Sequence, residues 1–311
     1  MDVVFTIDKN YTKYFCVALT SLLKNNNAII NSIYVVVDSI LNDDLKLISD
    51  FIQKRYNKSI IYLELESSVL NEFKISLHIS KATYFRLLLA EILPENINKI
   101  LFLDSDIIVT GNLTELQMLD FYPSETKIGR EKNNQLAAED QTPYIYAVNH
   151  KFSATDLARL NKLEFTGNVY FNAGVMLVNL KKWRLEKLSE RLIECAKINN
   201  DHLLWWDQDV LNLVLNNRWK EIDYRFNAFG LSYNKDLDYR IVHYISDKKP
   251  WKLICRHPQK KLFWKYAKMT PFYPRILFEY YLSFIEFIQR AIPYVIRNIR
   301  KFFSSNSKLH S

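Results

Sequence analysis

Two aspartates one residue apart, Asp104 and Asp106, lie in the apolar stretch "KILFLDSDIIVTGNL" (residues 99 to 113). Neighbouring carboxylates repel each other, and a divalent cation is the simplest compensation for that repulsion. Hard cations such as Mg²⁺ and Mn²⁺ take oxygen ligands and leave coordination positions open for phosphate groups. The pair therefore indicates a cation site that handles a phosphorylated substrate. The alternative is an aspartate that caps the following turn.

The second half of the chain offers further side chains that could do chemistry. The segment "WWDQDVLNLVLNN" places Asp207, Gln208 and Asp209 in the first turn of a predicted helix. Acids there suit the helix dipole, which is also their plain structural explanation. The segment "YRIVHYISDKKPW" predicts a strand that ends on His243, with Lys249 shortly after it. Taken alone, such a histidine is usually structural and such a lysine a solvated charge.

Strands and helices alternate through the region that must position these residues. Runs rich in β-branched residues predict strands, and segments with 3.6-residue periodicity predict helices between them. This alternation is typical of a parallel, doubly wound α/β sheet, which binds ligands at the carboxyl ends of its strands. The predicted strands are "DVVFTI", "SIYVVV", "IIYLEL", "KILFLD" and the start of "VYFNAGVMLVNLKKW"; the predicted helices include "CVALTSLLKN", "DDLKLISDFIQKRY" and "TYFRLLLAEIL".

Composition narrows the class of protein. The 311 residues are 49% hydrophobic, enough for one large α/β domain with an appendage. Three cysteines without paired spacing predict free thiols rather than a disulfide framework or a zinc site. The opening "MDVVFTIDKN" predicts a first strand rather than a signal peptide. No apolar run reaches the length of a membrane span, so we expect a cytoplasmic protein.

The net charge of +8 is concentrated in the tail. Residues 1–255 carry 31 Lys and Arg against 32 Asp and Glu, whereas residues 256–311 carry 11 against 2. Between Phe272 and Phe303 seven charges fall within one arc of roughly 100° on a helical wheel, and the rest of the wheel is almost wholly apolar. This pattern predicts an amphipathic helix, or two helices broken at Pro293, that lies on the anionic inner leaflet of a membrane. The alternatives are a helix packed on the domain or a dimer contact; nucleic-acid binding is disfavoured, because no recognition motif accompanies the basic patch.

Seven segments in order resemble the family 8 glycosyltransferases, retaining enzymes that use nucleotide sugars and include bacterial lipopolysaccharide galactosyl- and glucosyltransferases. The resemblance covers about residues 1–255. It implies a GT-A fold, a Rossmann-like doubly wound mixed sheet; the predicted helical tail over residues 256–311 lies outside it. The segments are "FTIDKNY", "ISKATYFRLLLAEILP", "KILFLDSDIIV", "YFNAGVMLVNLKKWR", "DQDVLN", "RFN" and "HYISDKKPW".

The resemblance implies a role for individual residues. Asp104, Asp106 and His243 match the ligands of Mn²⁺ (or Mg²⁺), and Lys249 matches a residue that neutralises the departing UDP. Three residues match uracil-binding positions: Asp8, Asn10 and Tyr11. Arg86 matches an arginine that reaches the donor sugar and pyrophosphate. Three further residues match positions that line the donor sugar: Asn172, Asp207 and Gln208. Gln208 is expected to steady an oxocarbenium-like sugar during front-face attack, because an amide is a poor leaving group in a double displacement.

Two positions depart from the family pattern. Ser246 stands where the family usually has a glycine whose backbone approaches the phosphate. Asn133 stands near where relatives carry an acid that faces the sugar cleft. We therefore expect an acceptor pocket of its own kind, formed by the polar residues 130–165.

The resulting hypothesis is a peripherally membrane-bound hexosyltransferase that moves glucose or galactose from a UDP-sugar to a glycan or lipid-linked glycan acceptor, in lipopolysaccharide or other surface-glycan biosynthesis. One alternative is a degenerate nucleotide-sugar-binding protein on the membrane. The other is a phosphohydrolase with a D-x-D nucleophile. That class usually has Thr or Val where this chain has Ile108, and its motif lies near the start of the chain.

Overall fold

The first half of the chain alternates strands and helices, as its hydrophobic pattern predicts. Strands β1 and β2 are wholly buried, and α1 is buried on most of its surface because it packs between the sheet and other helices. These elements are β1 (Val3–Ile7), α1 (Thr12–Asn26), β2 (Ile33–Val37), α2 (Asp43–Tyr56), β3 (Ile60–Glu64) and β4 (Lys99–Leu103). The structure is a computed structural model and describes residues 1–38, 43–65, 81–122, 142–151, 154–167, 169–230, 234, 236–245 and 247–306.

The main sheet has seven strands in the order β3-β2-β1-β4-β7-β6-β8. Its last three strands along that order are β7 (Phe171–Asn179), β6 (Ile145–Asn149) and β8 (Trp219–Glu221). The first four strands are mutually parallel, but β7 runs antiparallel to both β4 and β6. The purely parallel sheet predicted from strand–helix alternation is therefore wrong at β7, and the mixed α/β sheet implied by the family resemblance is confirmed.

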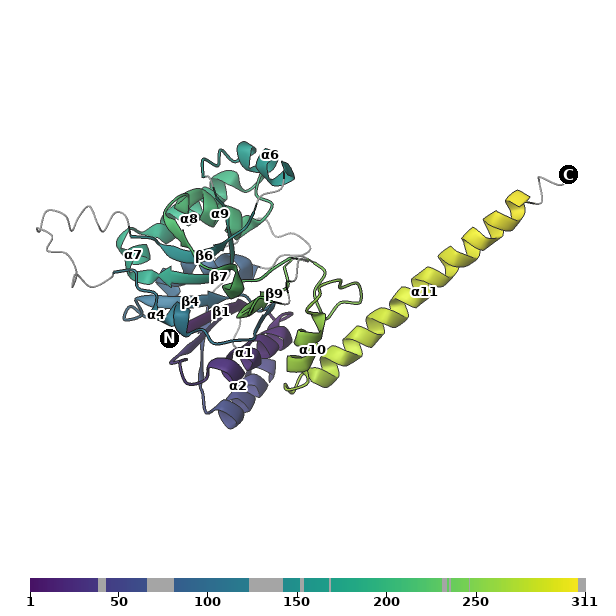
Figure 1. Cartoon of the computed structure of the whole chain (residues 1–311), viewed down its shortest axis with the longest axis horizontal. Helices are drawn as coiled ribbons and strands as arrows, with labels where there is room; N and C mark the ends of the chain where they lie inside the picture. Colours follow the sequence, from purple (N-terminus) through teal and green to yellow (C-terminus); the bar gives the residue numbers. More distant parts are fainter. Residues whose placement is uncertain are drawn as a thin grey trace, which may run out of the picture.

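Helices cover both faces of the sheet (Figure 1). Side chains alternate between the faces along each strand, so Val3 and Phe5 join one core with α1 and α2, and Val4 joins the other. The second core holds η2 (Lys81–Leu88), α3 (Leu89–Ile92), α7 (Leu180–Leu185), α8 (Leu188–Asn199) and α9 (Trp206–Leu215). Two independent cores fix the sheet from both sides, so its strand ends form a rigid edge.

The predicted helix in "TYFRLLLAEIL" is a 3₁₀ helix as far as Leu88 and becomes α-helical only at Leu89. Residues 84–90 are all buried, so this segment has no exposed face from which the helical period could be read. Several short elements were also not identified from the sequence: β6, β8, α4 (Thr114–Met118), α6 (Ala154–Lys162), α8 and η4 (Tyr224–Phe226).

A second, two-stranded sheet lies beside the main one. It pairs β5 (Ile107–Val109) with β9 (Ile241–His243) in antiparallel register, with Ile107 opposite His243. The backbone N–H of Tyr244 donates to the carbonyl of Asp106 at 3.0 Å. This small ladder therefore brings the residue before β5 next to the last residue of β9, although they are far apart in the sequence.

The C-terminal region consists of α10 (Lys260–Ala267) and α11 (Tyr273–Asn306). The base of α11 is attached to the domain: Ile276 is buried, Glu279 pairs with Lys13 at 2.6 Å, and Arg275 pairs with Asp44 at 2.7 Å. Beyond this base the helix projects away from the rest of the molecule (Figure 1). It continues through Pro293, so one helix forms rather than two.

Candidate active site

The two aspartates of the D-x-D segment meet His243 at the edge of the sheet. Asp104 follows β4, and Asp106 precedes β5, which pairs with the strand that ends on His243. The imidazole Nε2 lies 3.1 Å from Asp106 Oδ1 and 3.7 Å from Asp104 Oδ2. One ligand atom from each of the three residues falls within 4.8 Å of the others, so the cluster could hold a metal ion.

The hydrogen bond at its other nitrogen indicates the tautomer of His243. Nδ1 lies 2.9 Å from the side-chain oxygen of Asn227, which can only accept a hydrogen bond. Nδ1 therefore carries the hydrogen, and in a neutral ring Nε2 points its lone pair at the two carboxylates. Asp106 Oδ1 is buried and has no hydrogen-bond partner in the described part of the chain. Two carboxylates and a neutral imidazole in this state form a donor set that suits a divalent cation.

Lys249 adds a positive charge to the cluster. Its ammonium contacts Asp106 Oδ2 and donates to the carbonyl of Tyr244 at 2.7 Å. Burial alone would raise the pKa of Asp106, but the ammonium of Lys249 beside it outweighs burial and lowers this pKa below its usual range. The Asp106 carboxylate is therefore ionised.

Arg86 joins two carboxylates on the opposite side of the cluster. It lies 2.7 Å from Asp104 Oδ1 and 2.8 Å from Asp207 Oδ2, and its guanidinium stacks over the ring of Phe102. Burial raises the pKa of Asp207 to about 7, although Arg86 lowers it, and the nearby charge of Asp104 raises it further. Three carboxyl groups thus share two basic side chains, Arg86 and Lys249.

Gly174 makes the cluster possible by leaving space. Its carbonyl accepts the N–H of Asp104 at 2.8 Å, and a Cβ built there would lie 2.2 Å from His243 Cε1 and 2.7 Å from Asp104 Oδ2. This residue was not identified from the sequence. A glycine in the interior of a wholly buried strand was the available signal, because it marks a close approach of other groups to the backbone.

Asn172 and Gln208 contact each other between β7 and α9. Asn172 Nδ2 donates to Gln208 Oε1 at 3.1 Å, and the N–H of Ala173 donates to the same oxygen at 3.0 Å. Asp209 is fully buried and pairs with Arg159 at 2.7 Å, so it is far more than an exposed acid at a helix start. The predicted "DQD" residues are therefore part of the same polar cluster.

The three residues predicted to bind uracil follow β1. Asp8 Oδ1 accepts the N–H groups of Asn10 at 2.7 Å and Tyr11 at 3.1 Å, which shapes the turn into α1. Burial raises the pKa of Tyr11, and the charges of Asp106 and Asp8 raise it further. Tyr11 also packs edge-on against Trp251, in the segment that carries Lys249.

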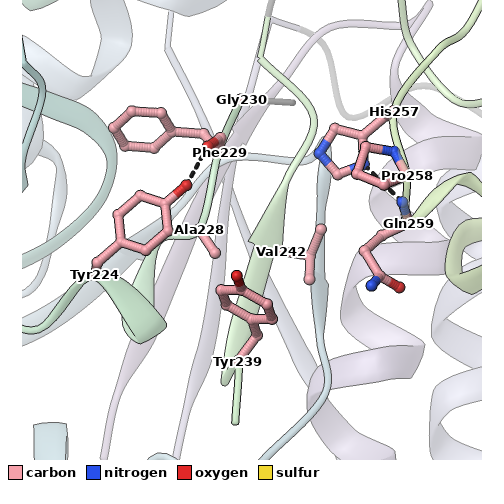
Figure 2. A pocket seen from close by; sticks show the side chains of 9 residues that line it. All are labelled: Tyr224, Ala228, Phe229, Gly230, Tyr239, Val242, His257, Pro258 and Gln259. Atoms are coloured by element: carbon pink, nitrogen blue, oxygen red, sulfur yellow. Dashed lines mark hydrogen bonds between the residues drawn. The ribbon is translucent and has the colours of Figure 1, made fainter. Parts of the chain in front are cut away.

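A separate pocket lies behind β9 (Figure 2). Val242 lines it, whereas the next residue, His243, points to the opposite face of the strand. The pocket is lined by Tyr224, Ala228, Phe229, Gly230, Tyr239, Val242, His257, Pro258 and Gln259. Its aromatic walls adjoin the metal cluster without forming part of it.

Two positions singled out in the sequence, Ser246 and Asn133, lie outside the residues that the structure describes. The same holds for parts of the segment 130–165, in which we expect the acceptor loops. Within that segment, His150 stacks on Phe229 with ring centroids 5.1 Å apart. The described part of the segment therefore meets the loop that lines the pocket.

Sequence comparisons agree with the geometry. Residues 2–255 match the profile of the family described as glycosyl transferase family 8. A putative glycosyltransferase from Haemophilus influenzae is 29% identical over 269 residues, which cover 83% of this chain and 74% of the relative. A lipopolysaccharide 1,3-galactosyltransferase from Salmonella typhimurium is 26% identical, over 87% of this chain and 78% of the relative.

Solved structures place the fold. The galactosyltransferase LgtC, in complex with donor and acceptor sugar analogs, superposes with a TM-score of 0.73 at 26% identity, covering 87% of this chain and 96% of LgtC. A glycosyltransferase GlyE from Streptococcus pneumoniae superposes with a TM-score of 0.62 at 24% identity, covering 91% of this chain and 63% of GlyE. The GT-A fold implied by the sequence is thereby confirmed, and the chain belongs to glycosyl transferase family 8.

Proposed function

We propose that this glycosyltransferase is a metal-dependent, retaining hexosyltransferase that transfers glucose or galactose from a UDP-sugar to a glycan acceptor in surface-glycan synthesis. The observation that carries the proposal is the cluster of Asp104, Asp106 and His243, in which a buried carboxylate oxygen lacks a hydrogen-bond partner among the described residues. The lipopolysaccharide galactosyltransferase among its relatives and the sugar-bound LgtC structure support the donor and the pathway class.

The three residues of the cluster would hold Mn²⁺ or Mg²⁺. When bound, such an ion supplies positive charge that stabilises a diphosphate leaving group. Lys249 donates hydrogen bonds to the same phosphates, since its ammonium already lies beside Asp106. Asp8, Asn10 and Tyr11 bind the uracil, with Tyr11 stacking on the base.

Arg86 and Asp207 orient the donor sugar, together with Asn172. Arg86 holds the carboxylates of Asp104 and Asp207 in fixed positions, so the sugar meets preorganised groups. Gln208 steadies positive charge on the sugar ring and does not attack it. In support, its Oε1 already accepts two hydrogen bonds, which reduces its nucleophilicity. Retention then follows from front-face attack, in which the departing phosphate accepts the proton of the acceptor hydroxyl.

The acceptor is proposed to bind among residues 130–165 and to be a lipid-linked glycan. The contact between His150 and Phe229 makes the aromatic pocket of Figure 2 a candidate wall for this acceptor. Aromatic rings suit the apolar faces of sugars.

The region 256–311 is proposed to hold the domain formed by residues 1–255 on the inner face of the plasma membrane. Large apolar side chains of α11, from Phe278 to Ile288, are exposed, and Arg and Lys residues follow them. Within the described part of the chain, no helix is both long and apolar enough to span a bilayer. An interfacial helix is the arrangement that uses such a surface.

Release of UDP from a panel of UDP-sugars, with and without Mn²⁺, tests the enzymatic proposal. We expect metal-dependent release from one sugar, lost in Asp106→Asn and kept in the control Asp50→Asn, because Asp50 lies exposed on α2. Binding of UDP without turnover, even after candidate acceptors are added, would instead support the degenerate binding protein. The phosphohydrolase alternative is not retained, since the chain belongs to a glycosyltransferase family.

A further inference from the structure

A chain of hydrogen bonds between buried side chains leads away from the metal cluster. His243 Nδ1–H donates to Asn227 Oδ1 at 2.9 Å, and Asn227 Nδ2 donates to Asn172 Oδ1 at 2.8 Å. Asn172 Nδ2 then donates to Gln208 Oε1 at 3.1 Å. Each amide accepts from the side of His243 and donates toward α9, so the chain has a single direction.

The far end of this chain is anchored by a charge. Gln208 Nε2 donates to the hydroxyl of Tyr170 at 3.2 Å, and that hydroxyl donates to Asp209 Oδ1 at 2.7 Å. Asp209 is fully buried, pairs with Arg159, and accepts the N–H groups of Leu204 and Trp205. A carboxylate accepts hydrogen bonds only, so it fixes the direction of every donor before it.

The backbone of β7 fixes the same direction. The N–H of Gly174 donates to Asn172 Oδ1 at 3.0 Å, and the N–H of Ala173 donates to Gln208 Oε1 at 3.0 Å. If the amide of Asn172 or Gln208 were rotated by 180°, its NH₂ group would face donors and its oxygen would face an acceptor. Two or more hydrogen bonds of the network would then be lost. Asn227 is held in turn, because its neighbour Ala228 bridges to β9 and accepts the N–H of His243 at 2.9 Å.

We propose, on the basis of the proposed function, that Asn227 is a positioning residue that joins the metal site to the donor-sugar site. At one end it holds His243 in the tautomer whose Nε2 faces Asp104 and Asp106. At the other end it sets, through Asn172, the orientation of the Gln208 amide. The two sites are therefore oriented by one polar network rather than separately.

The metal end is tested by titrating the protein with Mn²⁺ in the absence of nucleotide. The electron paramagnetic resonance signal of the free ion measures how much Mn²⁺ remains unbound. Asn227→Leu is expected to weaken Mn²⁺ binding by about 10- to 100-fold. Nitrogen-15 NMR of labelled histidines should show loss of the Nδ1–H tautomer at His243, whose signal is assigned by its absence in His243→Gln. The control Asn26→Asp changes another buried amide, one that bonds the backbone at Gly111 and Leu113 instead.

The sugar end is tested by Asn227→Asp and Tyr170→Phe. In Asn227→Asp the new carboxylate still accepts from His243 but cannot donate to Asn172, so Mn²⁺ affinity should stay within about threefold while kcat for UDP release falls about tenfold. Tyr170→Phe should lower kcat similarly without changing Mn²⁺ affinity, and the two changes should combine less than additively. Tyr144→Phe is the matched control, because it removes a hydroxyl that bonds Glu186 outside the network.

Wild-type Mn²⁺ affinity and an unchanged His243 tautomer in Asn227→Leu would overturn the inference, as would an unchanged kcat in Asn227→Asp. The failure of the proposed function gives a different result. A wild type that binds Mn²⁺ but releases no UDP would refute the transferase proposal, while the tautomer and Mn²⁺ measurements would still decide the role of Asn227.

Discussion

The metal cluster and helix α11 both carry charged side chains, but their surroundings differ. In the metal cluster and beside it, Asp104, Asp106 and Asp207 each contact Arg86 or Lys249 of the same chain in a largely buried setting. On α11 the large apolar side chains beyond Glu279 that lie exposed in the described part of the chain have no such buried setting. The metal cluster is thus held in place by contacts within the chain, whereas the exposed surface of α11 could be buried only by another molecule.

The largest effect should come from filling the space at Gly174. Gly174→Ala would push a methyl group into His243 and Asp104, so we expect Mn²⁺ affinity and UDP release each to fall by about 100-fold or more. Mn²⁺ titration and a UDP-release assay measure these losses. Gly111→Ala is the control, since its new methyl group meets only the flexible end of Arg240. Equal activity in both variants would show that the metal cluster tolerates a methyl group at position 174.

The next largest effect separates the base of α11 from its projecting part. Ile276 is buried, so Ile276→Ala should destabilise the protein by about 2 to 4 kcal/mol. Ile285 is about half exposed, and Ile285→Ala should change the free energy of unfolding by less than about 0.5 kcal/mol. Urea unfolding of both variants makes the comparison. Similar losses would mean that the projecting part also packs on the domain.

Truncation after Ser283 tests the partner of the projecting part. It keeps the buried base of the helix, unlike removal of all residues from 272 onward, which would also delete Phe272 and Ile276 from the core. We expect sedimentation with vesicles containing phosphatidylglycerol to fall about tenfold while UDP release stays within about twofold. Unchanged sedimentation would exclude the lipid surface. A full-length dimer that becomes a monomer on truncation would assign the helix to self-association.

The smallest effect is the pH dependence of stability due to His257, which lies between β9 and α10. Burial lowers the pKa of His257 to about 4, and its Nδ1 accepts the N–H of Gln259. The unfolded chain binds this proton at pH values below about 6.5, whereas the folded chain does not, so stability should fall as the pH drops from about 6.5 to 4. Because His257 is partly exposed, we expect a loss of roughly 1 to 2 kcal/mol, reduced in His257→Asn. Thermal unfolding across this pH range measures the loss, and identical curves for both proteins would contradict it.

The first strands of the sheet and the carboxylate pair could be predicted from the sequence, because local residue patterns determine them. Strand–helix alternation located β1 to β4, and the D-x-D spacing located the carboxylate pair at a strand end. The sequence placed His243 at a strand end, but only the family resemblance assigned it as a metal ligand, since a lone histidine is usually structural. Its place beside Asp106 depends on the pairing of β5 with β9.

The residues that were missed act through long-range geometry. Gly174 matters because β7 runs antiparallel beside β4, which no local pattern reveals. Asn227 was noticed only as part of "RFN", and its role emerges from contacts with His243 and Asn172. Tyr170 has an ordinary position before a strand, and only the fold brings its hydroxyl to Gln208 and Asp209.

The β5–β9 ladder also bears on how the chain folds. Its two strands are separated by a long stretch of sequence, and closing so long a loop costs entropy that local helices do not have to overcome. We therefore expect Asp104 and Asp106 to meet His243 late in folding, after the local helices have formed. Capture of Mn²⁺ by a refolding chain would then mark a late step, and its time course would report the completion of the domain.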